Sequence, residues 1–156
     1  MGLNAQSASW TLRPLPEGQA ETRGDLKDRE AQGPRKYRAS IARADILDRD
    51  RLEETAGTPQ SWKFDDFVRA FLLMLPYRVD KVRQALAAGD WGEARLAAQS
   101  LSWSASMAGA CRLELIAGLI DADLQSGRHA RARETARVLP GATAELEAAI
   151  TRLSAG

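Results

Sequence analysis

The chain has 156 residues, 44% of them hydrophobic, and a formal net charge of +1. This length suits one domain of ordinary size with a tail and excludes two large domains. Because acidic and basic residues nearly balance, no net field attracts a polyanion, and we expect no nucleic-acid partner. The single cysteine, Cys111, and the single histidine, His129, exclude a disulfide framework and the usual zinc patterns. We therefore expect no metal and no other cofactor.

The first segment, residues 1–42, contains glycine, proline and charged residues in mixed order, without a helical or strand period. Such a composition buries too little apolar surface to offset the entropy of ordering, so we predict a disordered or linker-like tail. The longest apolar run, Ala70 to Pro76, is far shorter than the about 20 residues that cross a bilayer. Since no apolar signal segment is present at the start, we expect a cytoplasmic protein with no membrane contact.

Residues 43–156 are predicted to form a domain built only of helices. A short helix is expected within residues 46–57, where Asp48 can cap its start and Gly57 can end it. A long helix is expected over residues 62–88, bent at Pro76, because apolar residues recur there at helical spacing.

A third helix is expected to begin after Asp90, a residue type that caps helices, and to end near Gly109. A fourth spans Leu113 to Leu124, and the last runs from about Arg128 to Leu153 with a possible interruption at Pro140 and Gly141. Short loops between long amphipathic helices force antiparallel neighbours. The predicted fold is therefore an all-α, antiparallel up-down four-helix bundle with a short extra helix at its N-terminal end.

One stretch, Ala97 to Leu113, is expected to be helical and to carry two opposed apolar faces. The inward stripe has helical spacing and consists of Ala94, Ala97, Ala98, Leu101, Ala105 and Ala108. The opposite side carries Leu96, Gln99, Trp103 and Met107, flanked by Arg95, Ser102 and Ser106. Since a small domain needs only one buried face per helix, the second face predicts contact with something else.

The same stretch carries a recognisable pattern of framework residues. Leu101 is followed at fixed spacing by Gly109, Ala110 and Leu113, and the helix is preceded by a Gly89-Asp90 turn. In helix order and in this spacing, the chain resembles the bacterial histidine-containing phosphotransfer (HPt) family from Ile46 to Leu153. The phosphoacceptor helix of that family has the form A-H-x-L-K-G-S-x-x-x-x-G-A. The resemblance implies a four-helix bundle of two-component phosphorelay signalling, with a receiver domain or a histidine kinase as partner.

The chemical residues of that pattern are replaced. Gln99 stands at the position of the phosphoacceptor histidine, Ser102 at that of the lysine and Trp103 at that of the glycine. A carboxamide has no nitrogen nucleophilic enough to take a phosphoryl group. Three changes at one site predict a docking or adaptor module that binds without accepting phosphate and is not an enzyme. We expect partner docking through Leu96, Gln99, Ser102, Trp103, Ser106 and Met107.

Two alternatives remain open at this point. The chain could transfer phosphate through an acceptor residue that the pattern does not reveal. It could also be a helical protein-interaction domain unrelated to signalling, since LAAGDWGEARLAA and LQSGRHARARETA weakly resemble tetratricopeptide units. About three such repeats are normally needed to bury a continuous core, and only two segments occur here.

Overall fold

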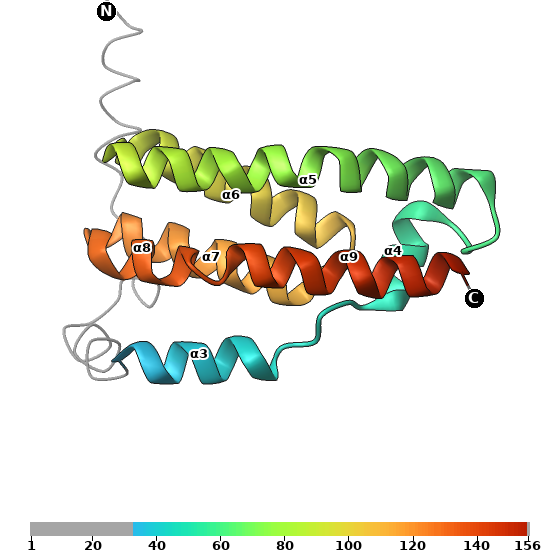
Figure 1. Ribbon diagram of the computed structural model, residues 1–156, viewed down its shortest axis with the longest axis horizontal. Coiled ribbons are helices and arrows are strands. Elements are labelled where there is room, and N and C mark those ends of the chain that lie inside the picture. Colours follow the sequence, from blue (N-terminus) through green and yellow to red (C-terminus); the bar gives the residue numbers. More distant parts are fainter. Residues whose placement is uncertain (1–32, 156) are drawn as a thin grey trace, which may run out of the picture. The chain divides into compact units, whose positions relative to one another are not determined.

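The computed structural model describes residues 33–155, and all regular secondary structure in this range is helical (Figure 1). The helices are α3 (Gly33–Arg43), α4 (Arg49–Ala56), α5 (Trp62–Ala88), α6 (Trp91–Met107), α7 (Cys111–Gln125), α8 (His129–Ala136) and α9 (Leu139–Ala155). The predicted all-α class is confirmed.

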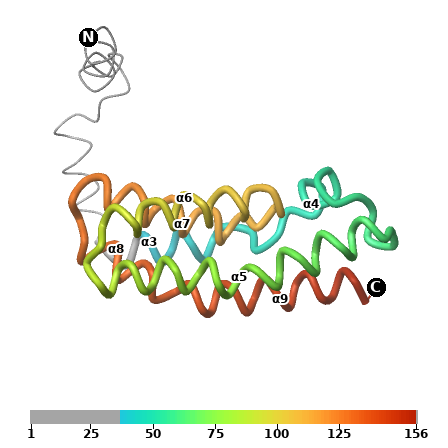
Figure 2. The backbone as a smooth tube through the Cα atoms, turned by 90° about the horizontal axis from the view of Figure 1, so that it is seen from above, coloured from blue at the N-terminus to red at the C-terminus, as the bar shows by residue number. Residues whose placement is uncertain are grey.

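The core of the fold is a four-helix bundle, in which α8 and α9 together make the fourth helix. Helix α6 packs between α5 and α7, and the α8–α9 pair contacts both α7 and α5, so that the four helices enclose one core. Figures 1 and 2 show α5 lying alongside α9, with α6 and α7 as the second pair. Each connection reverses the chain direction, as the short loops predict.

The helix starts are set by local capping. The side chains of Asp48, Ser61 and Asp90 accept hydrogen bonds from backbone N–H groups three residues on, at 3.2 Å in each case. These bonds satisfy donors that the first turn of a helix leaves without a partner. Gly57 and Gly89 end α4 and α5 with positive φ angles of 91° and 70°. The caps predicted at Asp48, Gly57 and Asp90 are confirmed.

Pro76 does not interrupt α5, which is one continuous helix over 27 residues. Proline at this position removes the bond that its N–H would donate to the carbonyl of Leu72. The flanking turns compensate by burying the core residues Leu75 and Val79, which hold the helix against the bundle on both sides of the proline.

The stretch Ala97 to Leu113, expected as one helix, is divided between α6 and α7. The break is at Gly109, whose φ angle is 69°. The carbonyl of Gly109 accepts a 2.7 Å bond from the N–H of Asp48, and a Cβ added to Gly109 would lie 2.4 Å from the Asp48 carbonyl oxygen. Glycine is therefore required here both for the turn and for the close approach of α4.

The last predicted helix is also divided, as the sequence allowed, but at a different place. α8 ends at Ala136 and α9 begins at Leu139, so the interruption precedes Pro140 and Gly141. Pro140 lies in the first turn of α9, where the missing N–H costs nothing because those donors have no intrahelical partner.

The tail is predicted over residues 1–42, but residues 33–42 belong to helix α3. Residues 1–32 of the predicted tail lie outside the described part. Arg112 of α7 donates to the carbonyl of Ala42 (3.1 Å), within the last turn of α3, and to that of Ala44 (2.8 and 3.1 Å), just beyond its end. Ile41 is buried in the core, and the Tyr37 ring lies 3.9 Å from the guanidinium of Arg131. These contacts come from α7 and α8, far away in sequence.

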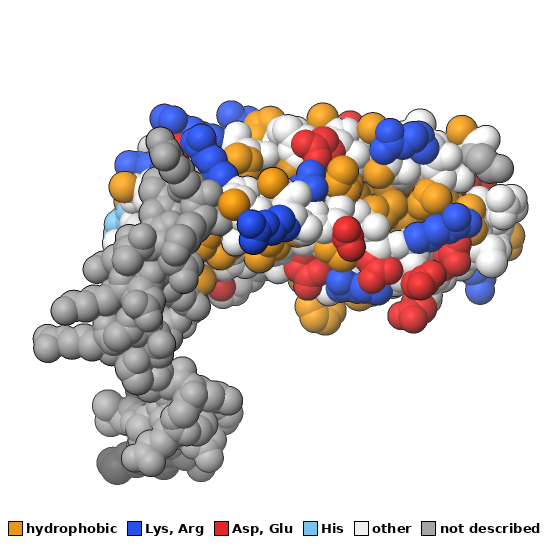
Figure 3. All heavy atoms as spheres, turned by 90° about the horizontal axis from the view of Figure 1, so that it is seen from below, with side chains coloured by type: hydrophobic (Ala, Val, Ile, Leu, Met, Phe, Trp, Pro, Cys, Tyr) orange, Lys and Arg blue, Asp and Glu red, His pale blue; other side chains and the backbone are white. Residues whose placement is uncertain are grey.

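Two further observations concern the length of the described helices and the distribution of charge on the surface. No helix in residues 33–155 is long and apolar enough to span a membrane. On the face shown in Figure 3, basic and acidic side chains are interspersed with apolar ones rather than segregated by sign.

Replacing Gly109 with alanine is expected to destabilise the fold by about 2–4 kcal/mol, because the new Cβ both strains the positive φ and meets the backbone of α4. Urea unfolding followed by circular dichroism measures this loss. Gly118→Ala is the matched control, since no atom lies within 4 Å of a Cβ at that helical position. The control should be stabilised by up to about 1 kcal/mol. Equal stability of the two variants contradicts the requirement for glycine.

Arg112→Ala is expected to release α3, because the substitution removes the donors to Ala42 and Ala44 as well as the ion pair with Glu145. Hydrogen exchange should become at least about tenfold faster at the α3 amides and change little in α6. Arg38→Ala, which removes only the exposed pair with Glu134, should have a smaller effect. Unchanged exchange in α3 would show that Arg112 does not hold it.

Candidate functional site

The inward face of α6 is made almost entirely of small side chains. Ala94, Ala98, Leu101 and Ala105 are each 0% exposed. Alanine presents so little bulk that α5 and α7 can pack close to α6. The α6 helix is therefore held in one rotational setting, and this setting determines which residues face outward.

The outward face of α6 carries large apolar side chains that no other helix of residues 33–155 covers. Leu96 is 63% exposed, Trp103 72% and Met107 43%. Together with exposed Gln99 they form a stripe at helical spacing, about 16 Å long at 1.5 Å per residue. We call Leu96, Gln99, Trp103 and Met107 the α6 stripe. The predicted opposition of two apolar faces on this helix is confirmed.

Gln99, which the sequence pattern predicts to stand at the position of the phosphoacceptor histidine, is hydrogen-bonded to α7. Its Nε2 donates to the two carboxylate oxygens of Asp121 at 3.3 and 3.4 Å. The same carboxylate accepts a 3.1 Å bond from Nε of Arg95. A phosphoryl group on residue 99 would therefore be placed beside a carboxylate whose charge only one arginine offsets.

The two serines predicted for docking are half-buried, unlike the rest of the set. Ser106 is engaged by Arg51 of α4, which donates to its Oγ at 2.8 Å and to its carbonyl at 3.0 Å. Arg51 also pairs with Glu114 at 3.2 Å, and this carboxylate raises the pKa of Arg51. Ser106 thus helps to join α4, α6 and α7. Ser102 borders the α6 stripe.

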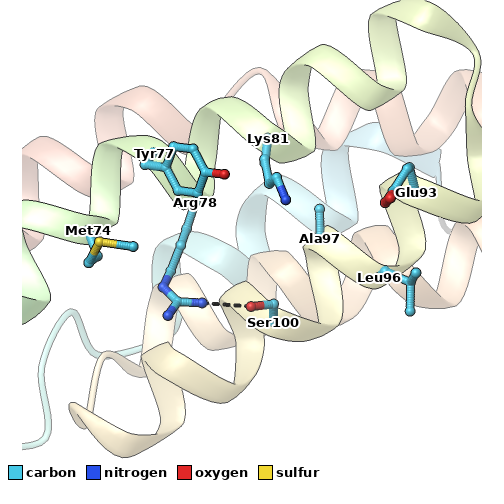
Figure 4. A pocket seen from close by; sticks show the side chains of 8 residues that line it. All are labelled: Met74, Tyr77, Arg78, Lys81, Glu93, Leu96, Ala97 and Ser100. Carbon is cyan, nitrogen blue, oxygen red and sulfur yellow. Dashed lines mark hydrogen bonds between the residues drawn. The ribbon is translucent and has the colours of Figure 1, made fainter.

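The structure adds residues of α5 that the sequence reasoning missed. Met74 and Tyr77, 42% and 56% exposed, face α6 across a groove of about 400 Å³. The groove is lined by Met74, Tyr77, Arg78, Lys81, Glu93, Leu96, Ala97 and Ser100 (Figure 4). Ala97, expected on the inward stripe, instead lines this groove. The available signal was the three-to-four spacing of Met74, Tyr77 and Lys81 on the side of α5 away from its core stripe.

The basic side chains of the groove come from α5. Arg78 donates from Nη1 to Oγ of Ser100 at 2.6 Å, the bond drawn in Figure 4. Lys81 holds its ammonium 5.6 Å from the centre of the Tyr77 ring. Two cations therefore lie beside α6, where the sequence pattern predicts the uncharged Ser102 at the position of the family's lysine.

Two features bear on the chemistry of the described residues, the potential metal ligands and the single histidine. Within residues 33–155, no group of three or more His, Cys, Asp or Glu side chains could hold a metal ion. His129 stacks on Trp91 with ring centres 4.0 Å apart. Trp91 begins α6, eight residues before Gln99, or about 12 Å along the helix, so the imidazole does not serve position 99.

Comparison with known proteins yields one match. The family model of the Hpt domain matches residues 66–156, which include most of α5 and all of α6 to α9. No curated protein and no solved structure matches the chain. Hpt domains interact with receiver and kinase domains in phosphorelays. Because the matched region covers more than half of the chain and coincides with the four-helix bundle, the chain belongs to the Hpt domain family of two-component signalling.

Proposed function

We propose that this chain is a pseudo-phosphotransfer module, which binds a receiver domain or a histidine kinase domain without accepting phosphate. The observation that carries the proposal is the hydrogen bonding of the Gln99 side chain. At the position of the acceptor histidine, its carboxamide donates to the carboxylate of Asp121, beside the exposed indole of Trp103.

The chemistry of phosphotransfer is the first support. A phosphorelay needs a nitrogen lone pair that attacks an acyl phosphate and later releases the phosphoryl group. The lone pair of an amide nitrogen is delocalised into its carbonyl, and Nε2 of Gln99 acts here as a donor. The uncharged Ser102 supplies no cation to offset a phosphoryl group. Position 99 therefore lacks the nucleophile, and position 102 lacks the charge that the family pattern places beside it.

The contact surface is the second support. Trp103 replaces the glycine of the family pattern and is 72% exposed, so it fills space in which a partner would otherwise approach the backbone. Tryptophan anchors at the centre of an interface contribute a large share of binding energy. The α6 stripe thus lies where members of the family contact their partners. Its apolar composition favours stable binding of a partner over transfer of a phosphoryl group.

Trp103→Ala is expected to weaken binding to the partner about 30-fold, corresponding to about 2 kcal/mol for loss of a desolvated anchor. Isothermal calorimetry against purified receiver domains and histidine kinase domains measures the change. The matched control is Trp62→Ala, because Trp62 is similarly exposed, at 71%, but lies at the start of α5. Absence of binding to every receiver and kinase domain, or equal losses for both variants, refutes the docking role.

The chain is expected to take up no phosphate from a donor. It is incubated with a receiver domain phosphorylated with labelled phosphate and with an autophosphorylated kinase, and label on the chain is measured after electrophoresis. An Hpt protein that retains its histidine is the positive control for each donor. Label that depends on any residue of this chain would establish a transfer function and overturn the non-acceptor proposal.

A further inference from the structure

The groove between α5 and α6 has the size and the mixed apolar and basic lining of a binding site for a short polypeptide segment. Its volume, about 400 Å³, is in the range of sites that hold a few side chains. Its apolar walls are the side chains of Met74, Tyr77, Leu96 and Ala97, contributed by two helices. Leu96 belongs to the α6 stripe as well, so the groove and the stripe form one continuous surface.

The cations of the groove have no carboxylate partner. Among the described residues, neither Arg78 nor Lys81 lies within 4.0 Å of an acidic oxygen, whereas Arg95 and Arg51 are both paired. Arg78 is half-buried, and its bond to Ser100 uses one of five N–H donors. Ser100 thereby orients the guanidinium and leaves further donors for a ligand.

The charge balance of the groove selects the ligand. Arg78 and Lys81 contribute two positive charges, and Glu93 contributes one negative charge. A single carboxylate compensates the excess, whereas a phosphate polymer would meet Glu93 and the apolar walls. A carboxylate can receive paired bonds from a guanidinium. An apolar side chain next to that carboxylate would cover Met74 and Leu96.

We propose that the α5–α6 groove binds an acidic segment of the partner protein, in which a carboxylate pairs with Arg78 and Lys81 while a neighbouring apolar side chain contacts Met74 and Leu96. The nature of the partner rests on the function proposed above; the chemistry of the contact rests on the groove. The positive charge of the α5–α6 groove thus comes from Arg78 and Lys81 of α5.

Two peptides test the groove without any assumption about the partner: a capped Leu-Asp-Leu-Asp peptide and its Leu-Asn-Leu-Asn counterpart. Each is titrated into the ¹⁵N-labelled full chain, and amide shifts are followed by NMR. The acidic peptide should shift the amides of Tyr77, Leu96 and Ala97, with a millimolar dissociation constant that weakens with salt. The amide peptide should bind more weakly.

Arg78→Gln is expected to raise the dissociation constant of the acidic peptide about threefold to tenfold, because the substitution removes the charge-assisted bonds. Arg69→Gln is the matched control, an exposed arginine on α5 that does not line the groove. Trp103→Ala should leave peptide binding unchanged, since Trp103 is not part of the groove lining. If the unsubstituted chain binds the acidic peptide but binds no receiver or kinase domain, the result contradicts the proposed function alone.

The assignment is overturned if the acidic peptide shifts no groove amide, if both peptides bind equally, or if Arg78→Gln has no effect. It is also overturned if another occupant is found. Replacing Glu17 and Glu21 with glutamine in the full chain should not raise peptide affinity; an increase would show that the N-terminal segment competes for the groove. Concentration-dependent self-association that Arg78→Gln abolishes would instead identify a second copy of the chain.

Discussion

The fully buried inner face of α6 is the constraint on which the rest of the surface depends. Its alanines and Leu101 allow α5 and α7 to approach closely, and any rotation of α6 about its axis would expose these residues and bury charged ones. The outward position of Gln99 and Trp103 follows directly from this packing. The core behind α6 therefore fixes the backbone of the proposed docking surface, and a fixed backbone loses less entropy on binding.

The same packing brings residues of different helices to one surface. Asp121 of α7 reaches Gln99 from one side, and Arg78 of α5 reaches Ser100 from the other. One side of α6 thus meets a carboxylate and the other a pair of cations. In a phosphate acceptor, a carboxylate beside the acceptor atom would oppose the added charge, whereas in a docking surface it only orients an amide.

Local periodicity and capping were sufficient to predict much of the fold. The caps at Asp48, Gly57 and Asp90 act within a few residues of themselves, so their roles are visible in the sequence. Helix α3 was missed for the opposite reason. It contains few apolar residues, and the side chains that hold it, such as Arg112, lie about 70 residues away.

For the site, the sequence by itself determined the opposed faces of α6, because these depend only on residue type and helical spacing. It also predicted that Gln99, Ser102 and Trp103 stand where the family pattern has histidine, lysine and glycine. Only the tertiary structure decided that Ser106 is engaged by Arg51 and that Arg78 and Met74 face α6 across a groove. The physical reason is that a helical period specifies which side of a helix is apolar. The rotation and offset of neighbouring helices, which select the residues that meet, arise from core packing between distant segments.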